Sequence, residues 1–410
     1  MKKLLLVLLI LSLFINHLNA NEKDLQIIQK DKKEYRLLDK ESIQTRQQSQ
    51  KYDWISPIDL SGNIGRNHSF SDENSRNLNN KNTKSASIGF TQSIFESGGI
   101  GFKMDYADNR FKYEMLSWEN QNSQLIYTIY NTLLDIKKLK LEINQNDYRI
   151  VNKDIELIIK KIQYEAGKTD IIELNNAIMS KNLILKEEIA LKNSLKEKEQ
   201  ELAKYTDLKY DEIEILDFQE TNKEIFLDKN YSILEADAKV EMLNSEYKIK
   251  KSQYLPKLSL SAKASYSSQD EKFNSMINDT NKDDATSSGS LILSMPLYDY
   301  TKSSKIQESK IEVLKQKALV NDLKNETAFE YEQIFTKIDT YLKQNETINK
   351  NIKLYEELIG ANQISSEAGM TSKYDLEILE NTKTINEFDI LINKINILQQ
   401  YAKLYFKIKN

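Results

Sequence analysis

The sequence predicts a mainly helical protein that also contains four membrane-type β-strands and an internal duplication. Two stretches, from Phe102 to Ala166 and from Leu297 to Ile359, contain neither Gly nor Pro, which favours very long helices. Four short segments alternate apolar and polar residues with a period of two, which is typical of a strand between lipid and water. Because these features occur twice in the same order, we interpret the chain as two copies of one structural plan.

The first 20 residues, MKKLLLVLLILSLFINHLNA, have the pattern of a cleaved secretory signal peptide. Lys2 and Lys3 form the charged start, an apolar core follows, and Ala20 is a small residue at the expected cleavage point. A membrane anchor is the alternative, but the apolar run is too short to span a bilayer. We therefore expect residues 1–20 to be removed from the mature protein.

Structural repeat 1 is expected to cover residues 21–205. It begins with a helix over 21–53 and continues with strands at about 55–65 and 85–95, separated by an Asn- and Ser-rich loop over 66–84. A long helical hairpin follows, with its turn near Gly167, which can adopt the left-handed conformation that ends a helix. Asp170 can then cap the returning helix.

Residues 206–230 lose the helical period, and we interpret them as a connector in which 211–218 (DEIEILDF) is irregular or a short strand. Structural repeat 2 covers 231–410, with a helix over 231–253, strands at about 256–267 and 288–298, and a helical hairpin that turns near Gly369. The matching landmarks of the two repeats lie roughly 200 residues apart, which indicates duplication. Pro57, Pro256 and Pro296 are expected at the junctions of helix and strand.

Apolar residues in the long helices recur at alternating steps of three and four, which is the seam of a left-handed coiled coil. The predicted seam residues are Tyr148, Val151, Ile155, Ile158 and Ile162 in repeat 1, and Ile334, Ile338, Tyr341, Asn345, Ile348, Ile352, Tyr355 and Ile359 in repeat 2.

Four strands from one chain cannot close a membrane barrel, and lipid does not tolerate an open sheet edge. We therefore expect the chain to oligomerise, so that a ring of strands from several subunits continues into a ring of helices and forms a tube. A soluble coiled-coil protein with incidental hairpins is the alternative, but it would not need apolar–polar alternation in all four strands.

These segments together resemble the TolC-like outer-membrane efflux proteins. The resemblance is carried by YLPKLSLSAKASY, SGSLILSMPLYD, SASIGFTQSIFESGG and the turns YEAGKTDIIEL and SEAGMTSKYDLEIL, in the order found in the family. It implies a homotrimeric tube in which each subunit gives four strands to a twelve-stranded outer-membrane β-barrel and long coiled-coil helices to a periplasmic α-barrel. It further implies that the protein is the outer-membrane duct of a tripartite efflux pump or a type I secretion system in a Gram-negative bacterium.

The resemblance also implies partners: a periplasmic adaptor (membrane fusion protein) and an inner-membrane RND or ABC transporter. Two alternatives stay open at this point, namely that the chain is itself a periplasmic adaptor, or that it is a structural coiled-coil protein of the cell envelope. An adaptor would have one hairpin and Gly- and Val-rich domains, and neither alternative requires duplicated membrane strands.

The family closes its periplasmic end near the hairpin turns, and by resemblance Asp375 is the gate residue here. Ile378 stands where the family has a second acidic residue, and Glu173 is the equivalent of Asp375 in repeat 1. The spacing allows a different interpretation, because Ser372 with Asp375, and Asp170 with Glu173, are spaced as capping boxes. The small turn residues Ala166, Gly167, Ala368 and Gly369 are expected either to cap the helices or to contact the adaptor. The residues that follow the glycines, Lys168 and Met370, are expected adaptor contacts as well.

The chain has almost none of the Cys and His residues on which many catalytic sites depend. The sequence contains no Cys and two His, of which His17 lies in the signal peptide and His68 in the predicted polar loop. Cysteine or histidine nucleophiles and ordinary zinc sites are therefore excluded, and we expect no enzyme activity, metal or cofactor. The formal net charge of −4 gives no basic footprint for nucleic acid.

Overall fold

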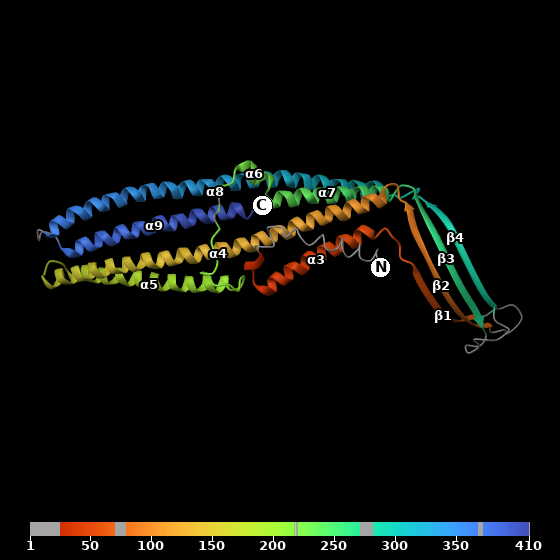
Figure 1. The fold of residues 1–410 in the computed structure, drawn as a ribbon, viewed down its shortest axis with the longest axis horizontal. Coiled ribbons are helices and arrows are strands. Elements are labelled where there is room, and N and C mark those ends of the chain that lie inside the picture. Colours follow the sequence, from red (N-terminus) through yellow and green to blue (C-terminus); the bar gives the residue numbers. More distant parts are fainter. Residues whose placement is uncertain are drawn as a thin grey trace, which may run out of the picture. The chain divides into compact units, whose positions relative to one another are not determined.

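The computed structural model describes residues 25–69, 79–216, 218, 220–270, 282–367 and 372–409. These described residues form two compact units: one takes those within 25–40, 116–235 and 321–409, and the other those within 41–115 and 236–320. The predicted signal peptide, 1–20, lies outside the described residues. In chain order the elements are η1 (Leu25–Ile27), α3 (Lys30–Tyr52), β1 (Asp59–Ser69), β2 (Asn79–Phe95), α4 (Gly99–Glu165), α5 (Ile171–Leu202), α6 (Lys223–Asp228), α7 (Tyr231–Ser252), β3 (Lys257–Asp270), β4 (Lys282–Ser294), α8 (Lys302–Glu367) and α9 (Lys373–Tyr405) (Figure 1).

One succession of elements occurs twice: α3-β1-β2-α4-α5 is followed by α7-β3-β4-α8-α9. The two longest helices, α4 and α8, have 67 and 66 residues, so each is about 100 Å long at 1.5 Å per residue. Helix α8 continues through Gly360, although glycine weakens a helix interior by about 1 kcal/mol relative to alanine. No helix in the described part of the chain is both long enough and apolar enough to cross a bilayer.

In the first unit the long helices run as antiparallel pairs joined by polar side chains. The Gln145 amide of α4 donates to Asp389 of α9 at 2.7 Å, and the Asn393 amide of α9 donates to Asn345 of α8 at 2.9 Å. The predicted seams lie along these contacts, and Ile155, Ile334 and Ile338 are buried. The other seam residues of the described helices keep part of their surface exposed, up to 55% for Ile162.

The core of this unit includes an element that the sequence did not predict. Helix α6 lies within the predicted connector, where Asn222 caps its first turn, and Phe226 is fully buried against Ile334, Ile338, Leu404 and Ile408. The segment 211–218 contains no strand among its described residues, 211–216 and 218. Main-chain bonds join the C-terminal residues to the start of α7, where Tyr231 N donates to Lys407 O at 2.9 Å.

The second unit contains one antiparallel sheet with the strand order β1-β2-β3-β4 (Figure 1). Strands β1 and β2 extend into the predicted loop 66–84, and β3 and β4 extend beyond 267 and before 288. The prediction placed His68 in a loop, but its backbone belongs to β1 and pairs with Asn80. These strands are longer because backbone pairing does not require the apolar residues on which the prediction rested.

The two repeats leave the sheet differently. Strand β2 continues to Phe95 through an irregularity in register between Ser93 and Phe95. Strand β4 ends at Ser294, so the predicted strand 288–298 is too long at its end. Pro296 explains the difference, because proline has no N–H for the ladder and the first repeat has Ser93 at the corresponding place.

Candidate functional site

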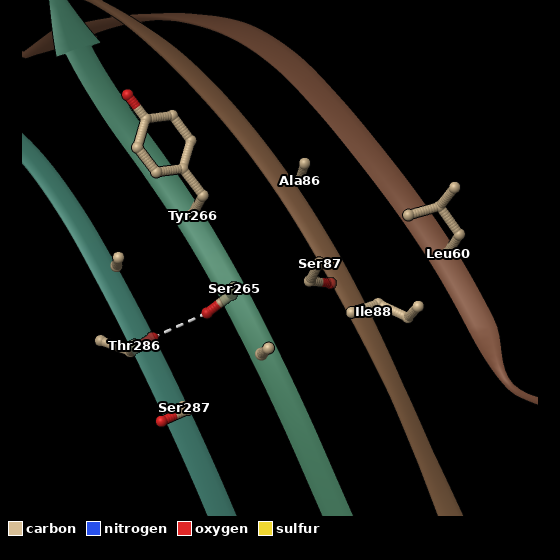
Figure 2. A pocket seen from close by; sticks show the side chains of 10 residues that line it. Leu60, Ala86, Ser87, Ile88, Ser265, Tyr266, Thr286 and Ser287 are labelled. Atoms are coloured by element: carbon tan, nitrogen blue, oxygen red, sulfur yellow. Dashed lines mark hydrogen bonds between the residues drawn. The ribbon is translucent and has the colours of Figure 1, made fainter.

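The sheet has one face that is apolar over most of its length. Leu60 lies opposite Ile88, Ile88 opposite Ala264, and Ala86 opposite Tyr266, and side chains of directly paired residues lie on the same face. Figure 2 shows Leu60, Ile88 and Tyr266 on three neighbouring strands. Leu60 is 78% exposed and Ile88 is 49% exposed. We call this surface, built on the pairs that include Leu60, Ile88 and Tyr266, the apolar face.

The opposite face, which we call the polar face, has cross-strand pairs of hydroxyl groups. Ser61 bonds to Ser87 at 2.8 Å between the hydroxyl oxygens. Ser265 bonds to Thr286, also at 2.8 Å (Figure 2). A further pair, Thr91 with Ser261, is joined at 3.1 Å. Lipid can cover the apolar face while water covers the polar face, which is the division expected of a membrane strand.

The turn from β2 into α4 is tied to the start of β3. Ser97 and Gly98 both adopt left-handed conformations, with φ of 52° and 88°, and this reverses the chain within two residues. The Ser97 hydroxyl donates to the main-chain oxygen of Pro256 at 2.7 Å, directly before β3 begins. Pro256 therefore lies at a helix–strand junction, as predicted, whereas no pattern in the sequence indicated the role of Ser97.

Gln92 holds the corresponding segment before β1. The sequence placed it among the apolar residues of its strand, but its side chain satisfies main-chain groups. Its Oε1 accepts from the Ser56 N–H at 2.9 Å, and its Nε2 donates to Trp54 O at 2.9 Å. These bonds fix the chain next to Pro57, which lies two residues before β1.

Asp299 organises the junction between β4 and α8, beyond Pro296. Its Oδ1 accepts from both the N–H and the hydroxyl of Thr301 at 2.7 Å, and its Oδ2 accepts from the Tyr254 hydroxyl at 3.2 Å. The bonds from Thr301, followed by the bond from Tyr254, lower the pKa of Asp299 to about 2. Leu297, in the segment between β4 and α8, is nevertheless 91% exposed.

The tip of the first helical hairpin is closed by main-chain bonds. Lys168 N donates to Gln163 O and Gly167 N donates to Tyr164 O, while Gly167 has φ of 69°, which is a Schellman ending. This confirms the predicted glycine cap, and it leaves Ala166, Gly167 and Lys168 exposed at the tip.

Asp170 caps α5 by accepting from the Glu173 N–H at 2.9 Å, as predicted. The Glu173 carboxylate does not return to Asp170, because it pairs with Lys160 of α4 at 2.9 Å. Glu173 therefore takes part in an ion pair within its own hairpin.

The second tip is different. Ala368, Gly369 and Met370 lie outside the described residues. Ser372 caps α9 by accepting from the Tyr374 N–H, while the Asp375 N–H donates to the main-chain oxygen of Ser372. The capping box predicted for Ser372 and Asp375 is therefore wrong, because the serine hydroxyl turns to an earlier N–H. Asp375 is exposed, and its carboxylate has no bond within the described part of the chain, while Ile378 is partly buried in α9.

Comparison with known proteins agrees with this arrangement. Residues 224–403 match the family model described as outer membrane efflux protein. The match runs from α6 into α9, so this part of the chain is similar to outer membrane efflux proteins. The two-faced sheet and the long helical hairpins agree with the role of an outer-membrane efflux channel that extends into the periplasm. No curated protein matches the sequence.

Solved structures share the fold of this chain over nearly its whole length. The outer membrane protein VceC of Vibrio cholerae is 12% identical, with a TM-score of 0.72 over 93% of this chain and 94% of that one. The CmeC outer membrane channel of Campylobacter jejuni is 12% identical, with a TM-score of 0.70 and coverage of 93% and 86%. The MtrE outer membrane channel of Neisseria gonorrhoeae is 11% identical, with a TM-score of 0.68 and coverage of 94% and 88%.

Proposed function

We propose that three copies of this chain form one channel, in which twelve strands close a barrel with the polar face toward the lumen. The observation that carries the proposal is a two-faced sheet whose outer strands, β1 and β4, each have only one neighbour in the described chain. Consecutive strands alternate in direction, so β4 of one copy and β1 of the next run antiparallel and can continue the ladder. Twelve is an even number within the range of membrane barrels.

We propose that the helical hairpins form the periplasmic part of the duct and dock on a periplasmic adaptor, which links it to an inner-membrane RND or ABC transporter. The partly exposed seam residues support a helical tube, because further copies of the chain can cover them. The proposed adaptor contacts are the tip residues Ala166, Gly167 and Lys168 of the first hairpin and Ala368, Gly369 and Met370 of the second. The cargo belongs to a drug or metal efflux pump or to type I secretion.

Asp375 is the proposed periplasmic gate residue. Its exposed carboxylate at the start of α9 is available to face the same residue of the other copies. Ile378, one turn further on, would narrow the opening without adding charge. Glu173 is a weaker gate candidate because Lys160 already balances its charge.

The proposed role is passage and not catalysis. The chain has no Cys, and His68 is the only His that remains after removal of the signal peptide. Transport through a duct needs no nucleophile or cofactor, so this composition suits the proposal.

Adjacent residues on opposite faces of β2 provide the test. Ile88→Lys would place a charge in lipid, which destabilises a membrane barrel by about 2–4 kcal/mol per substitution near the bilayer centre. Ser87→Lys would place the same charge in the lumen. We expect Ile88→Lys to abolish heat-modifiable trimers in the outer-membrane fraction, and Ser87→Lys to retain them. Trimers of normal yield for Ile88→Lys, together with loss for Ser87→Lys, would contradict the proposed orientation.

A further inference from the structure

One row of the polar face carries two opposite charges on either side of a glycine. Asp59 of β1 lies opposite Gly89 of β2, and Gly89 lies opposite Lys263 of β3. Asp59 and Lys263 are therefore two strand spacings apart, roughly 10 Å. Both side chains are exposed, and neither has an ion-pair partner in the described part of the chain.

Gly89 leaves room for the side chain of Lys263, because it has no side chain of its own. A Cβ added at Gly89 would lie 3.3 Å from both Cβ and Cγ of Lys263, and 3.0 Å from Ala262 O. The aliphatic stem of Lys263 therefore lies over the glycine, on the side of the sheet that also carries Asp59. A larger residue at position 89 would have to displace this stem.

The row borders a hollow of about 450 Å³ on the polar face. Asp59, Gly89 and Lys263 line it together with polar neighbours that include Ser61, Thr91 and Ser261. The hollow leaves room for water or for a polar group of a passing molecule beside both charges.

The other described charges of this face stand well away from the row. Lys257 begins β3 six residues before Lys263, and Asp284 of β4 pairs with Ser267, four residues beyond it. At about 3.3 Å per residue these distances are roughly 20 and 13 Å, longer than the roughly 10 Å between Asp59 and Lys263. Asp59 and Lys263 therefore lie closer to each other than Lys263 lies to either of these charges, and they contribute most to the potential at this row.

We infer that Asp59 and Lys263 form a charge-balanced selectivity ring in the barrel lumen. Three copies would supply three carboxylates and three ammonium groups in alternation around the passage. Such a ring opposes neither anions nor cations, and it offers counter-charges to cargo that carries both signs, such as zwitterionic molecules. The inference rests on the proposed function, because it requires the polar face to line the lumen.

The test measures reversal potentials of single channels in a planar bilayer under a KCl gradient. All variants carry Asp375→Ala, so that the proposed acidic gate does not determine the selectivity. Lys263→Gln should raise the K⁺/Cl⁻ permeability ratio by about twofold or more, and Asp59→Asn should lower it similarly, since each leaves three uncompensated charges. The variant that combines Lys263→Gln with Asp59→Asn should have the same K⁺/Cl⁻ permeability ratio as the Asp375→Ala parent.

Lys84→Gln is the matched control, because it removes one positive charge from β2 in a row that includes Ile64 of the apolar face. It should leave the reversal potential unchanged. Unaltered potentials in both single variants, or shifts in the same direction, would overturn the inference while the conducting channel still supports the proposed function. Failure of the parent protein to conduct would overturn both.

Discussion

At the scale of single residues, a buried arginine joins two helices through several hydrogen bonds. Arg36 of α3 is 8% exposed. It donates from Nε to Asn122 Oδ1 at 2.6 Å and from a terminal nitrogen to Trp118 O at 2.9 Å, while the Trp118 indole donates to Arg36 O at 2.8 Å. Burial lowers the pKa of Arg36, and Asp39 opposes that effect. An arginine pKa lies far above neutral pH, so the group stays charged and these bonds fix α3 on α4.

Arg36→Met should destabilise the helical unit by about 2–3 kcal/mol, because it breaks bonds to a charged donor and leaves their buried acceptors unpaired. The measurement is the denaturant midpoint of the helical circular dichroism signal in detergent. Arg46→Met in the same helix is the control. Its ion pair with Glu114 is at 3.0 Å, but the arginine is 44% exposed, and a surface pair contributes about 1 kcal/mol or less. Equal losses for the two variants would refute the role of Arg36.

At the scale of elements, the repeats use the same helices and strands but different connections. The first repeat passes from sheet to helix in a tight turn at Ser97 and Gly98, whereas the second uses an extended segment held by Asp299. The hairpin tips also differ, since Glu173 pairs with Lys160 while the Asp375 carboxylate has no bond within the described residues. The junctions and tips of the two copies have therefore diverged more than the helices and strands that they connect.

Two glycines of the long helices should respond oppositely to the same substitution. Gly167→Ala should destabilise its hairpin tip by about 1–2 kcal/mol, because its φ of 69° is unfavourable for a residue with a Cβ. Gly360→Ala should stabilise its helix by about 1 kcal/mol, because an added Cβ meets no atom within 4 Å. Amide hydrogen exchange of peptides covering each site measures both effects. Matching changes at the two sites would show that backbone conformation does not govern the response.

At the scale of the whole molecule, the single chain is incomplete in two places. The sheet has two edge strands. In the segment between β4 and α8, the apolar residues Leu297, Tyr298 and Tyr300 are almost fully exposed. Exposed apolar surface of this kind marks an interaction site. Both features suit assembly with further copies of the chain, on which the proposed gate at Asp375 also depends.

Asp375→Ala should raise the conductance of the trimer in a planar bilayer and weaken its block by multivalent cations, because a ring of carboxylates is the proposed constriction. Glu173→Ala is the control, and it should have a smaller effect because Lys160 already pairs with Glu173. Unchanged conductance and block in Asp375→Ala, or an equal change in both variants, would remove the gate assignment.

The sequence alone determined the long helices, the alternating strands, the repeated order and the glycine cap at Gly167. Each is encoded by residues close together in the chain, through periodicity or through a single backbone conformation. The sequence also carried the resemblance to outer-membrane efflux proteins, because the segments that resemble the family occur in the family's order.

Only the tertiary structure decided the register of the four strands, the bonds of Arg36 to α4, and the contact between Ser97 and Pro256. These features join residues far apart in the chain, so no local period encodes them. The structure also replaced the capping box at Ser372 and the strand beyond Pro296. At Ser372 several backbone donors compete for one hydroxyl, and at Pro296 the missing N–H outweighs the apolar pattern of Leu297 and Tyr298.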